Sequence, residues 1–269
     1  MIQAEKVYQD LEKIRLKSPL VHNITNYVVM NNTANALLAI GASPVMAHAL
    51  NEVTDMVNIA SSLVINMGTL SEQWVDAMLQ AGVVARSKNT PIVFDPVGVG
   101  ATTYRTETAK QIIETCKPHI IRGNASEIMS LIDTKVQTKG VDSTESTFTA
   151  VEASKQLAIQ TKSIVVISGE VDIITDGKTL IYIRNESPLM PRVTGMGCTA
   201  TALMGAFAAV NSNLLEAAAH TMVIMGITGE LAAKKSSGPG SLQVNFIDQL
   251  YNLSEEEIKT HLNTDYEKN

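Results

Sequence analysis

Apolar residues recur along the chain with two spacings, one typical of helices and one of short buried strands. Val7, Leu11 and Ile14 are three or four positions apart, which predicts an amphipathic helix over residues 3–17. Short apolar runs bounded by Gly, Pro, Asn or Asp then alternate with longer helical patterns. The predicted strands cover residues 20–24, 42–46, 63–66, 91–94, 119–122 and 164–168. The predicted helices between them cover residues 27–40, 51–60, 71–86, 107–116 and 147–161, with another that opens after residue 123.

The alternation changes after residue 168. Two β-rich runs, at residues 171–175 and 179–184, flank Asp176-Gly177-Lys178 and predict a hairpin. The rest of the chain predicts helices over residues 198–210 and 213–234 and from residue 241. Strands and helices with short connections predict an α/β fold, with a mostly parallel central sheet, helices on both faces and an antiparallel edge hairpin. We find no linker or repeat, so residues 1–269 are predicted to form a single domain.

Composition narrows the classes of protein that fit this pattern. The 269 residues are 45% hydrophobic and 18% charged, with a formal net charge of −6, which argues against a nucleic-acid-binding protein. No apolar run approaches the roughly 18 residues that span a bilayer, and the charged N-terminus has no signal-peptide core. Two cysteines, Cys116 and Cys198, suggest no disulfide framework. We therefore expect a soluble, cytoplasmic protein that binds neither nucleic acid nor a membrane.

Gly195-Met196-Gly197 joins a β-rich segment to a helix of small residues that begins near Cys198. Glycines allow close approach to a ligand and a positive φ, and a helix N-terminus offers free N–H groups to an anion such as phosphate. The same field is expected to lower the pKa of the Cys198 thiol. The segment lacks the lysine and spacing of a P-loop and the acidic residue of a dinucleotide fold. The segment therefore predicts a phosphoryl-transfer site that is neither a P-loop nor a dinucleotide-binding turn. The alternative is that the glycine turn only connects a strand to a helix.

Two carboxylates occupy positions that suit a metal site. Asp95 leaves a predicted strand just before Pro96, and Glu127 lies in the first turn of the helix that follows residue 123. Such a pair can hold Mg²⁺, mostly through water, and ATP chemistry requires a hard cation. The alternatives are a turn aspartate and a capping box, because Asn124 precedes Glu127 by three residues.

The remaining candidate residues divide into a nucleotide side and an acceptor side. Arg122 and Ser168 end predicted strands, where they can reach a nucleotide phosphate, although a surface ion pair and a turn explain them equally well. The acceptor side combines polar and apolar positions, which suits a small, partly apolar molecule with one or two polar handles. These positions include Asn26, Val28, Met46 and Gly68, of which Met46 can equally be core filler. The five histidines show no metal-ligand spacing.

Nine segments in order along the chain are more specific than these separate features. They are SPLVHNITNYVV, ANALLAIGASPVM, NMGTL, DPVGVGAT, RGNASEI, KGVDS, ISGEVD, VTGMGC and GPGS. In these segments the chain resembles the hydroxyethylthiazole kinase family, thiamine-salvage enzymes of the three-layer ribokinase-like fold. The resemblance implies that the γ-phosphoryl group of ATP is transferred to the hydroxyl group of 4-methyl-5-(2-hydroxyethyl)thiazole.

The resemblance also implies roles for residues where the motifs match. It assigns Met46 and Gly195 to the thiazole, Arg122 and Ser168 to ATP, and Asp95 and Glu127 to the Mg²⁺–phosphate region, with Asn26, Val28 and Gly68 as further pocket contacts. It further implies a homotrimer with active sites between subunits. Tyr27 and Met196 depart from the small polar residue and the alanine expected at these positions, so that substrate preference is expected to change modestly.

The position of Cys198 usually carries an aspartate base in the wider fold. Phosphoryl transfer has a loose transition state, so early deprotonation of the alcohol contributes little and positioning dominates. We therefore expect the backbone N–H groups from Gly195 through Gly197 to Cys198 to hold the transferring phosphoryl group, with Cys198 as a modest base or a positioning group.

Two alternatives stay open at this point. One is a kinase of the same fold that acts on another small heterocyclic alcohol, such as a hydroxymethylpyrimidine. Cys198 and the ITN and ASPVM segments argue against it. The other is a non-catalytic ligand-binding protein of the same fold, which would not require the carboxylates Asp95 and Glu127.

Overall fold

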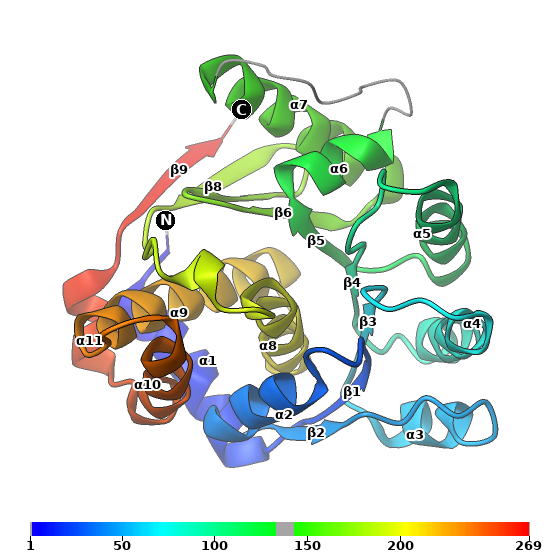
Figure 1. Ribbon diagram of the computed structural model, residues 1–269, viewed down its shortest axis with the longest axis horizontal. Helices are drawn as coiled ribbons and strands as arrows, with labels where there is room; N and C mark the ends of the chain where they lie inside the picture. The colour runs from blue at the N-terminus through cyan, green and yellow to red at the C-terminus, as the bar shows by residue number, and fades with distance from the viewer. Residues whose placement is uncertain (1, 133–142, 269) are drawn as a thin grey trace.

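The computed structural model describes residues 2–132 and 143–268, and one sheet runs through this part of the chain (Figure 1). Residues 139–142, which belong to the KGVDS match, lie outside the described residues. The strands are β1 (Leu20–Ile24), β2 (Ser43–Val45), β3 (Ser62–Asn66), β4 (Ile92–Asp95), β5 (Ile120–Asn124), β6 (Ile164–Ser168), β7 (Asp172–Thr175), β8 (Thr179–Ile183) and β9 (Thr264–Lys268).

The helices follow the strands closely in the first two thirds of the chain. They are α1 (Ala4–Lys17), α2 (Met30–Ala39), α3 (Val53–Ile59), α4 (Glu72–Ser87), α5 (Thr103–Cys116), α6 (Ala125–Ile132), α7 (Ser143–Thr161), α8 (Met196–Val210), α9 (Leu214–Lys234), α10 (Pro239–Asn252) and α11 (Glu255–His261), with a short 3-10 turn at Met190–Arg192.

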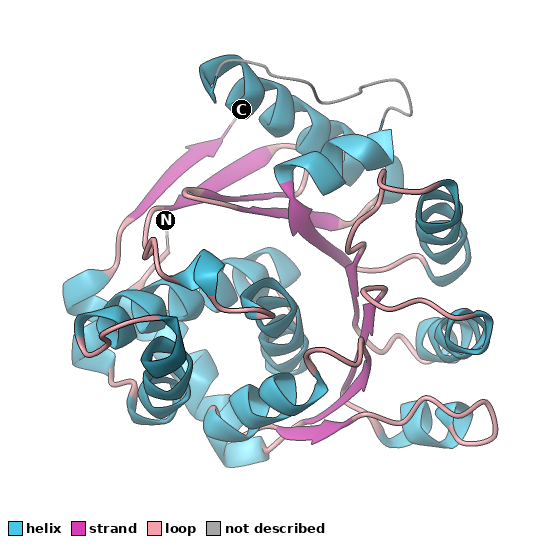
Figure 2. Cartoon of the chain, in the orientation of Figure 1, coloured by secondary structure: helices cyan, strands magenta, loops and turns pink. Residues whose placement is uncertain are grey.

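The sheet confirms the predicted α/β fold. Its strand order is β2-β1-β3-β4-β5-β6-β7-β8-β9; the pairs from β2 to β6 are parallel, and those from β6 to β9 are antiparallel. Helices lie on both faces (Figure 2). The face with α8 and α9 also carries α1, α2 and α10, whereas α3 to α7 cover the opposite face (Figure 1). Every residue of β3 is buried, which is why its central residues Leu63, Val64 and Ile65 are a continuous apolar run and do not alternate with polar ones.

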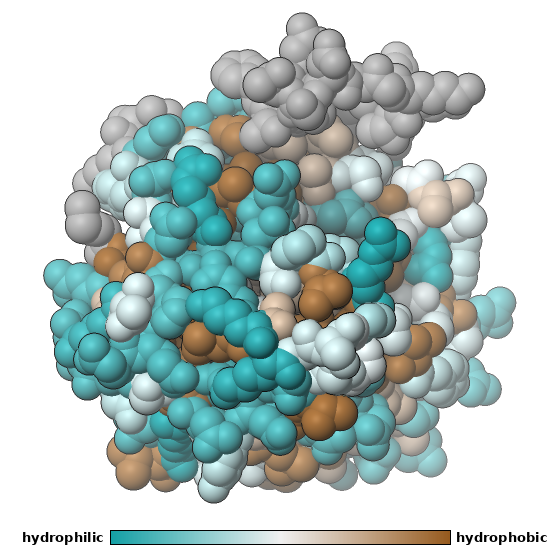
Figure 3. All heavy atoms as spheres, turned by 60° about the vertical axis from the view of Figure 1, so that its left-hand side comes forward, coloured by the Kyte–Doolittle hydropathy of each residue, from teal (hydrophilic) through white to brown (hydrophobic). Residues whose placement is uncertain are grey.

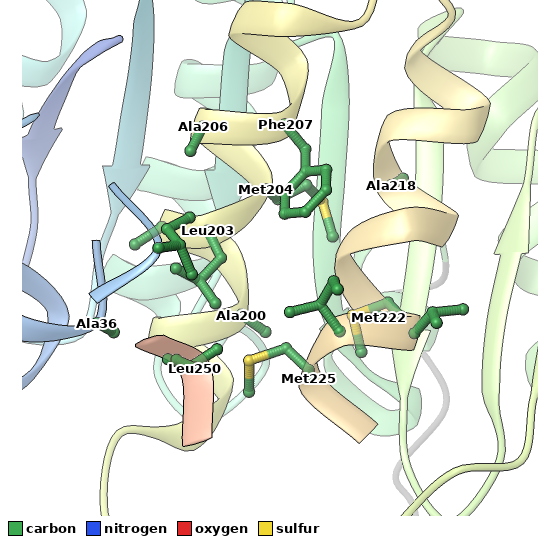
Figure 4. Packing of buried hydrophobic residues seen from close by; sticks show 14 of the residues in the cluster. Ala36, Ala200, Leu203, Met204, Ala206, Phe207, Ala218, Met222, Met225 and Leu250 are labelled. Atoms are coloured by element: carbon green, nitrogen blue, oxygen red, sulfur yellow. The ribbon is translucent and has the colours of Figure 1, made fainter. Parts of the chain in front are cut away.

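The densest apolar packing joins α8 to α9. Both helices are rich in small residues, and α8 is buried almost all round because it lies between the sheet and α9. Figure 4 shows Leu203, Met204 and Phe207 of α8 beside Met222 and Met225 of α9. This packing holds the N-terminus of α8 against the carboxyl ends of the parallel strands.

Several helices begin at other residues than the sequence pattern predicted. The helix predicted over residues 27–40 begins only at Met30, and α5 begins four residues earlier than predicted because Thr102 caps it. The helix predicted from Cys198 begins at Met196, so Cys198 is its third residue. The pattern did not predict α11 and β9; β9 pairs with β8 and forms the outermost strand beyond the hairpin.

Polar and apolar residues are unevenly represented on the molecular surface (Figure 3). Seen from the side of α9, α10 and α11, the surface is mainly hydrophilic with separate apolar spots (Figure 3). Among the described residues, no helix is both long enough and apolar enough to cross a membrane.

Candidate active site at the carboxyl ends of the parallel strands

Five polar residues form a row across neighbouring strands at the carboxyl edge of the sheet. Asn66 is the register partner of Asp95 in the β3–β4 pair, and Asn26 follows β1, the other neighbour of β3. Parallel strands align their ends, so residues far apart in sequence meet at one edge. The row is completed by Arg122 on β5 and Ser168 at the end of β6.

Hydrogen bonds and one ion pair connect this row. Asn26 Nδ2 donates to Asn66 Oδ1 at 2.8 Å, and Asn66 Nδ2 donates to Asp95 Oδ2 at 3.0 Å. Asp95 Oδ2 lies 3.6 Å from Arg122 Nη1, and Arg122 Nη2 donates to the hydroxyl of Ser168. The structure therefore brings together four predicted site residues that are spread along the sequence from Asn26 to Ser168, with Asn66 among them.

The N-terminus of α8 points at this row. Gly195 is the N-cap with a φ of 84°, and the first hydrogen bond of the helix runs from Thr199 N to Gly195 O. The N–H groups of residues 196–198 therefore have no partner within the helix and are free to bind an anion. Thr201 Oγ1, one turn further, donates to Asp95 Oδ2 at 2.7 Å and ties the helix to the sheet.

A pocket of about 640 Å³ lies beside the helix N-terminus. Its lining includes Arg122, Ser168, Gly195 and Gly197, all of which were predicted from the sequence. The lining also includes the apolar side chains of Met190, Val193, Met196, Met222 and Met225 and the acidic residues Glu170, Asp172 and Glu186. A pocket that combines phosphate donors with several apolar side chains suits a nucleotide, whose base can pack against the methionines.

The environment of Cys198 contradicts one prediction. The helix N-terminus was expected to lower the pKa of this thiol, but burial and the nearby Asp95 carboxylate raise it to about 11. Hydrogen bonds from the amides of Asn66 and Asn26 and the charge of Arg122 oppose this effect without overcoming it. Cys198 Sγ lies 3.5 Å from Asn26 Nδ2. The thiol is therefore protonated at neutral pH, because the cost of burying a thiolate exceeds the benefit of the helix field.

Asp95 is fully buried, and burial raises its pKa to about 6, although Arg122, Thr201 and Asn66 favour the ionised form. Glu127 also raises this pKa by repulsion. Asp95 Oδ1 has no hydrogen-bond partner among the described residues, and the same holds for Arg122 Nε beside it. An unpartnered carboxylate oxygen is the kind of ligand that Mg²⁺ prefers, so Asp95 fits the predicted metal role.

The Glu127 carboxylate, unlike that of Asp95, accepts hydrogen bonds at both of its oxygens. Its Oε1 accepts from Gly98 N and its Oε2 from Asn124 N, both at 2.8 Å, while Asn124 Oδ1 accepts from Glu127 N. This is the capping box that the sequence offered as the alternative, and it leaves Glu127 available to a cation mainly through water. No group of three or more His, Cys, Asp or Glu side chains within the described residues forms a metal cluster.

The predicted acceptor residues Asn26, Val28, Met46 and Gly68 lie in the segments that follow β1, β2 and β3. A Cβ on Gly68 would come within 2.5 Å of Asn26 Nδ2, and one on Gly195 would come within 2.7 Å of Val29 Cγ1, so both glycines allow close contacts. Val28 is 64% exposed, and Met46 is half-buried just after β2. Asn26, Val28, Met46 and Gly68 do not line the 640 Å³ pocket as the described residues form it.

Four residues with clear positions in the site carried no predicted role. Asn66 and Thr201 hold Asp95, and Arg105 donates to the carbonyl oxygens of Met67, Val97 and Gly68, which joins the loops after β3 and β4. Asp172 lines the pocket and accepts from Gly169 N at 3.0 Å. The sequence signal for Asn66 was a polar residue at the end of a buried strand; Thr201 and Arg105 lie in helices, where nothing local distinguishes them.

Comparison with known proteins finds similarity to one family over most of the chain. The sequence model described as "Hydroxyethylthiazole kinase family" matches residues 11–256. The hydroxyethylthiazole kinase of Syntrophus aciditrophicus (strain SB) is 56% identical over 262 residues, which cover 97% of each chain. That of Leptospira biflexa serovar Patoc is 54% identical over 255 residues, or 95% of this chain and 96% of the relative.

Solved structures agree with the sequence comparison. The hydroxyethylthiazole kinase protein from Pyrococcus horikoshii OT3 superposes with a TM-score of 0.90 at 38% identity and covers 98% of this chain and 100% of its own. The pyridoxal kinase from Staphylococcus aureus in complex with AMP-PCP has a TM-score of 0.65 at 14% identity, over 93% of this chain and 99% of its own. The second likeness concerns the fold alone.

Proposed function

The chain belongs to the hydroxyethylthiazole kinase family, and we propose that its row of polar residues and the N-terminus of α8 carry the family's reaction on this chain. The enzyme is an ATP-dependent phosphotransferase that phosphorylates the hydroxyl group of 4-methyl-5-(2-hydroxyethyl)thiazole in thiamine salvage. The single observation that supports this site best is the pocket in which Arg122, Ser168, Gly195 and Gly197 meet. We treat residues 1–269 as one catalytic domain.

The phosphate chain of ATP binds in the part of the pocket beside the N-terminus of α8. Arg122 and Ser168 contact the phosphates, and the N–H groups of Met196, Gly197 and Cys198 hold the transferring phosphoryl group. These donors are aligned before ATP binds, because the strand ends and the helix N-terminus are fixed by the core. The adenine packs against methionines of the pocket lining, such as Met190, Met222 and Met225.

The thiazole alcohol approaches from the side of Asn26 and Gly68, with Gly195 between alcohol and phosphate. Met46 and Val28 complete the apolar wall of this acceptor region. Cys198 positions the hydroxyl group, and its raised pKa supports a modest part in proton transfer. Mg²⁺, when bound with ATP, would neutralise phosphate charge, and Asp95 and Glu127 are the residues that would hold it, mostly through water.

The assembly and location of the enzyme belong to the same proposal. We propose a homotrimer with active sites between subunits, which is supported by the exposure of Tyr27 (63%) and Val28 (64%) next to the acceptor residues. Apolar side chains exposed beside a binding site are typical of a surface that a partner covers. We propose a cytoplasmic location, supported by the two free cysteines.

A coupled assay of ATP consumption against a panel of small alcohols tests the function. The thiazole alcohol is expected to give the highest kcat/KM and a phosphorylated product that mass spectrometry identifies. A clear preference for a hydroxymethylpyrimidine would contradict the assignment, as would ATP binding without any phosphorylated thiazole. Omission of Mg²⁺ from the same assay tests the metal requirement, and sedimentation analysis tests the trimer.

A further inference from the structure

The side-chain amide of Asn66 hydrogen-bonds to both sides of the site. Its Nδ2 donates to Asp95 Oδ2 at 3.0 Å, and its Oδ1 accepts from Asn26 Nδ2 at 2.8 Å and from Gly68 N at 3.0 Å. Asn66 is only 1% exposed and does not line the nucleotide pocket, so neither ATP nor the alcohol has a direct contact to gain from it.

The chemistry of these partners leaves the amide of Asn66 one orientation. Gly68 N can only donate and an ionised Asp95 can only accept, so the oxygen of Asn66 faces Gly68 and its nitrogen faces Asp95. Asn26 is oriented in turn, because its Nδ2 must face Asn66 while its Oδ1 accepts from Val28 N at 3.2 Å.

The orientation of the Asn66 amide also affects the surroundings of the Cys198 thiol and the Arg122 guanidinium. With Asn26 held this way, its nitrogen lies 3.5 Å from Cys198 Sγ on the acceptor side. With Asp95 held by Asn66 and by Thr201 Oγ1, its carboxylate lies 3.6 Å from Arg122 Nη1 on the nucleotide side. The two halves of the site thus share one amide, which adjoins Asp95 because the register of β3 and β4 pairs them.

We propose that Asn66 is a positioning residue for phosphoryl transfer: its amide fixes Asn26 and Asp95 together and so sets the acceptor alcohol against the phosphoryl group. This inference rests on the proposed function and extends it to a residue that touches neither substrate. A misplacement of about 1 Å between reacting groups can lower the rate about a hundredfold, so one buried amide can control turnover without binding a ligand.

The first experiment compares Asn66→Ala and Asn66→Asp with Ser62→Ala in the full-length enzyme. Asn66→Asp keeps the acceptor for Gly68 and Asn26 but loses the donor to Asp95. Ser62→Ala is the matched control, because Ser62 is a buried residue at the opposite end of β3 whose hydroxyl has no partner among the described residues.

Both Asn66 variants are expected to lower kcat by about 30- to 100-fold, with KM for ATP and for the thiazole alcohol within about threefold of wild type. Ser62→Ala is expected to keep kcat within about twofold. The stoichiometry of ATP binding, measured by calorimetry, separates lost turnover from lost folded protein. A wild-type kcat in folded Asn66 variants would overturn the inference, and so would a loss confined to KM for ATP.

A double-mutant cycle tests the shared amide even if Asn66→Ala does not fold. Asn26→Ala and Thr201→Val act on opposite ends of the connection, and the two residues do not hydrogen-bond to each other. Their combined effect on kcat is expected to be at least about threefold smaller than the product of the single effects, because each breaks the same alignment. Strictly multiplicative effects would overturn the inference. A wild-type enzyme that makes no phosphorylated thiazole would instead refute the proposed function.

Discussion

The guanidinium of Arg122 occupies the space where a side chain on Gly197 would be. A Cβ on Gly197 would come within 2.5 Å of Arg122 Nη1 and 2.7 Å of Nη2. Gly197 is the second residue of α8, where glycine ordinarily weakens a helix, and its φ is not positive. The requirement for glycine is therefore steric: it lets an arginine on β5 lie against the free N–H groups of α8.

Gly197→Ala is expected to displace Arg122 and to lower kcat/KM for ATP about a hundredfold, which corresponds to the loss of about 2–3 kcal/mol from a contact with a charged phosphate. Steady-state kinetics measures this. Gly240→Ala is the control, because no atom lies within 4 Å of the Cβ position on Gly240. Equal kinetics for Gly197→Ala and wild type would show that Arg122 does not need this space.

Cys198→Ala is expected to keep measurable turnover, with kcat reduced by less than about a hundredfold, the lower end of the usual contribution of a general base. Cys198→Asp is expected to keep activity as well, because a carboxylate there would reach the same hydroxyl group. Single-turnover measurements with the thiazole alcohol check both. Complete loss of turnover in Cys198→Ala, with ATP binding intact, would contradict a modest role for the thiol.

Alkylation of Cys198 by iodoacetamide is expected to accelerate about tenfold per pH unit from pH 7 to 10, because the reactive thiolate forms only as the pH approaches the pKa of about 11. Mass spectrometry of the labelled peptide measures the rate. Cys116 is fully buried with a pKa raised to about 12 by burial, so it serves as an internal unreactive site. An alkylation rate that levels off below pH 8 would instead show that the helix N-terminus lowers the pKa of the Cys198 thiol.

Asp172→Asn is expected to raise Tm at pH 8 and to leave it unchanged near pH 4. Burial raises the pKa of Asp172 from an ordinary 3.8 to about 7, while the hydrogen bond from Gly169 and the charge of Arg122 oppose that rise. A raised carboxyl pKa means that stability is fully present below pH 3.8 and is lost as the pH rises through 7. Scanning calorimetry between pH 4 and 8 measures the difference in Tm between Asp172→Asn and wild type. An equal difference in Tm at pH 4 and at pH 8 would contradict the prediction.

Asp10→Ala is expected to lower the free energy of unfolding by about 2–4 kcal/mol at pH 7 without changing KM for ATP, because it removes the buried hydrogen-bond acceptor of His220 and of Asn211, which caps the C-terminal end of α8. Asp10 Oδ2 lies 2.7 Å from His220 Nδ1 and accepts from Asn211 Nδ2 at 2.6 Å.

The acid dependence provides a further check on Asp10. Burial by itself raises the pKa of this carboxyl, but its bonds to His220, Lys13 and Asn211 hold the pKa below the ordinary 3.8. The stabilisation is present above pH 3.8 and is lost as the pH falls through the lowered value. Urea titrations should therefore show a difference between variant and wild type that shrinks below pH 3.8. A constant difference down to pH 2 would attribute the effect to packing alone.

The sequence pattern predicted the parallel sheet and the position of its functional edge because both depend on local properties. The run of Leu63, Val64 and Ile65 is apolar since both faces of its strand are covered, and the polar Asn66 follows it where the strand ends. Aligned strand ends then place Asn26, Asp95, Arg122 and Ser168 at one edge. The glycine turn before α8 could also be predicted from the sequence, because the positive φ of Gly195 and the start of a helix depend on adjacent residues.

Other features depend on atoms that are distant in sequence. The pairing of β9 with β8 joins residues 264–268 to 179–183, and no short polar segment at the end of a chain indicates its partner. The pKa of Cys198 rises because the fold buries the thiol beside Asp95, and the space that Gly197 leaves is filled by Arg122. Desolvation and steric exclusion act between groups that only folding brings together. Periodicity along the chain therefore specifies the elements and the edge at which they meet, whereas the charge state and alignment of the site arise from contacts across strands and helices.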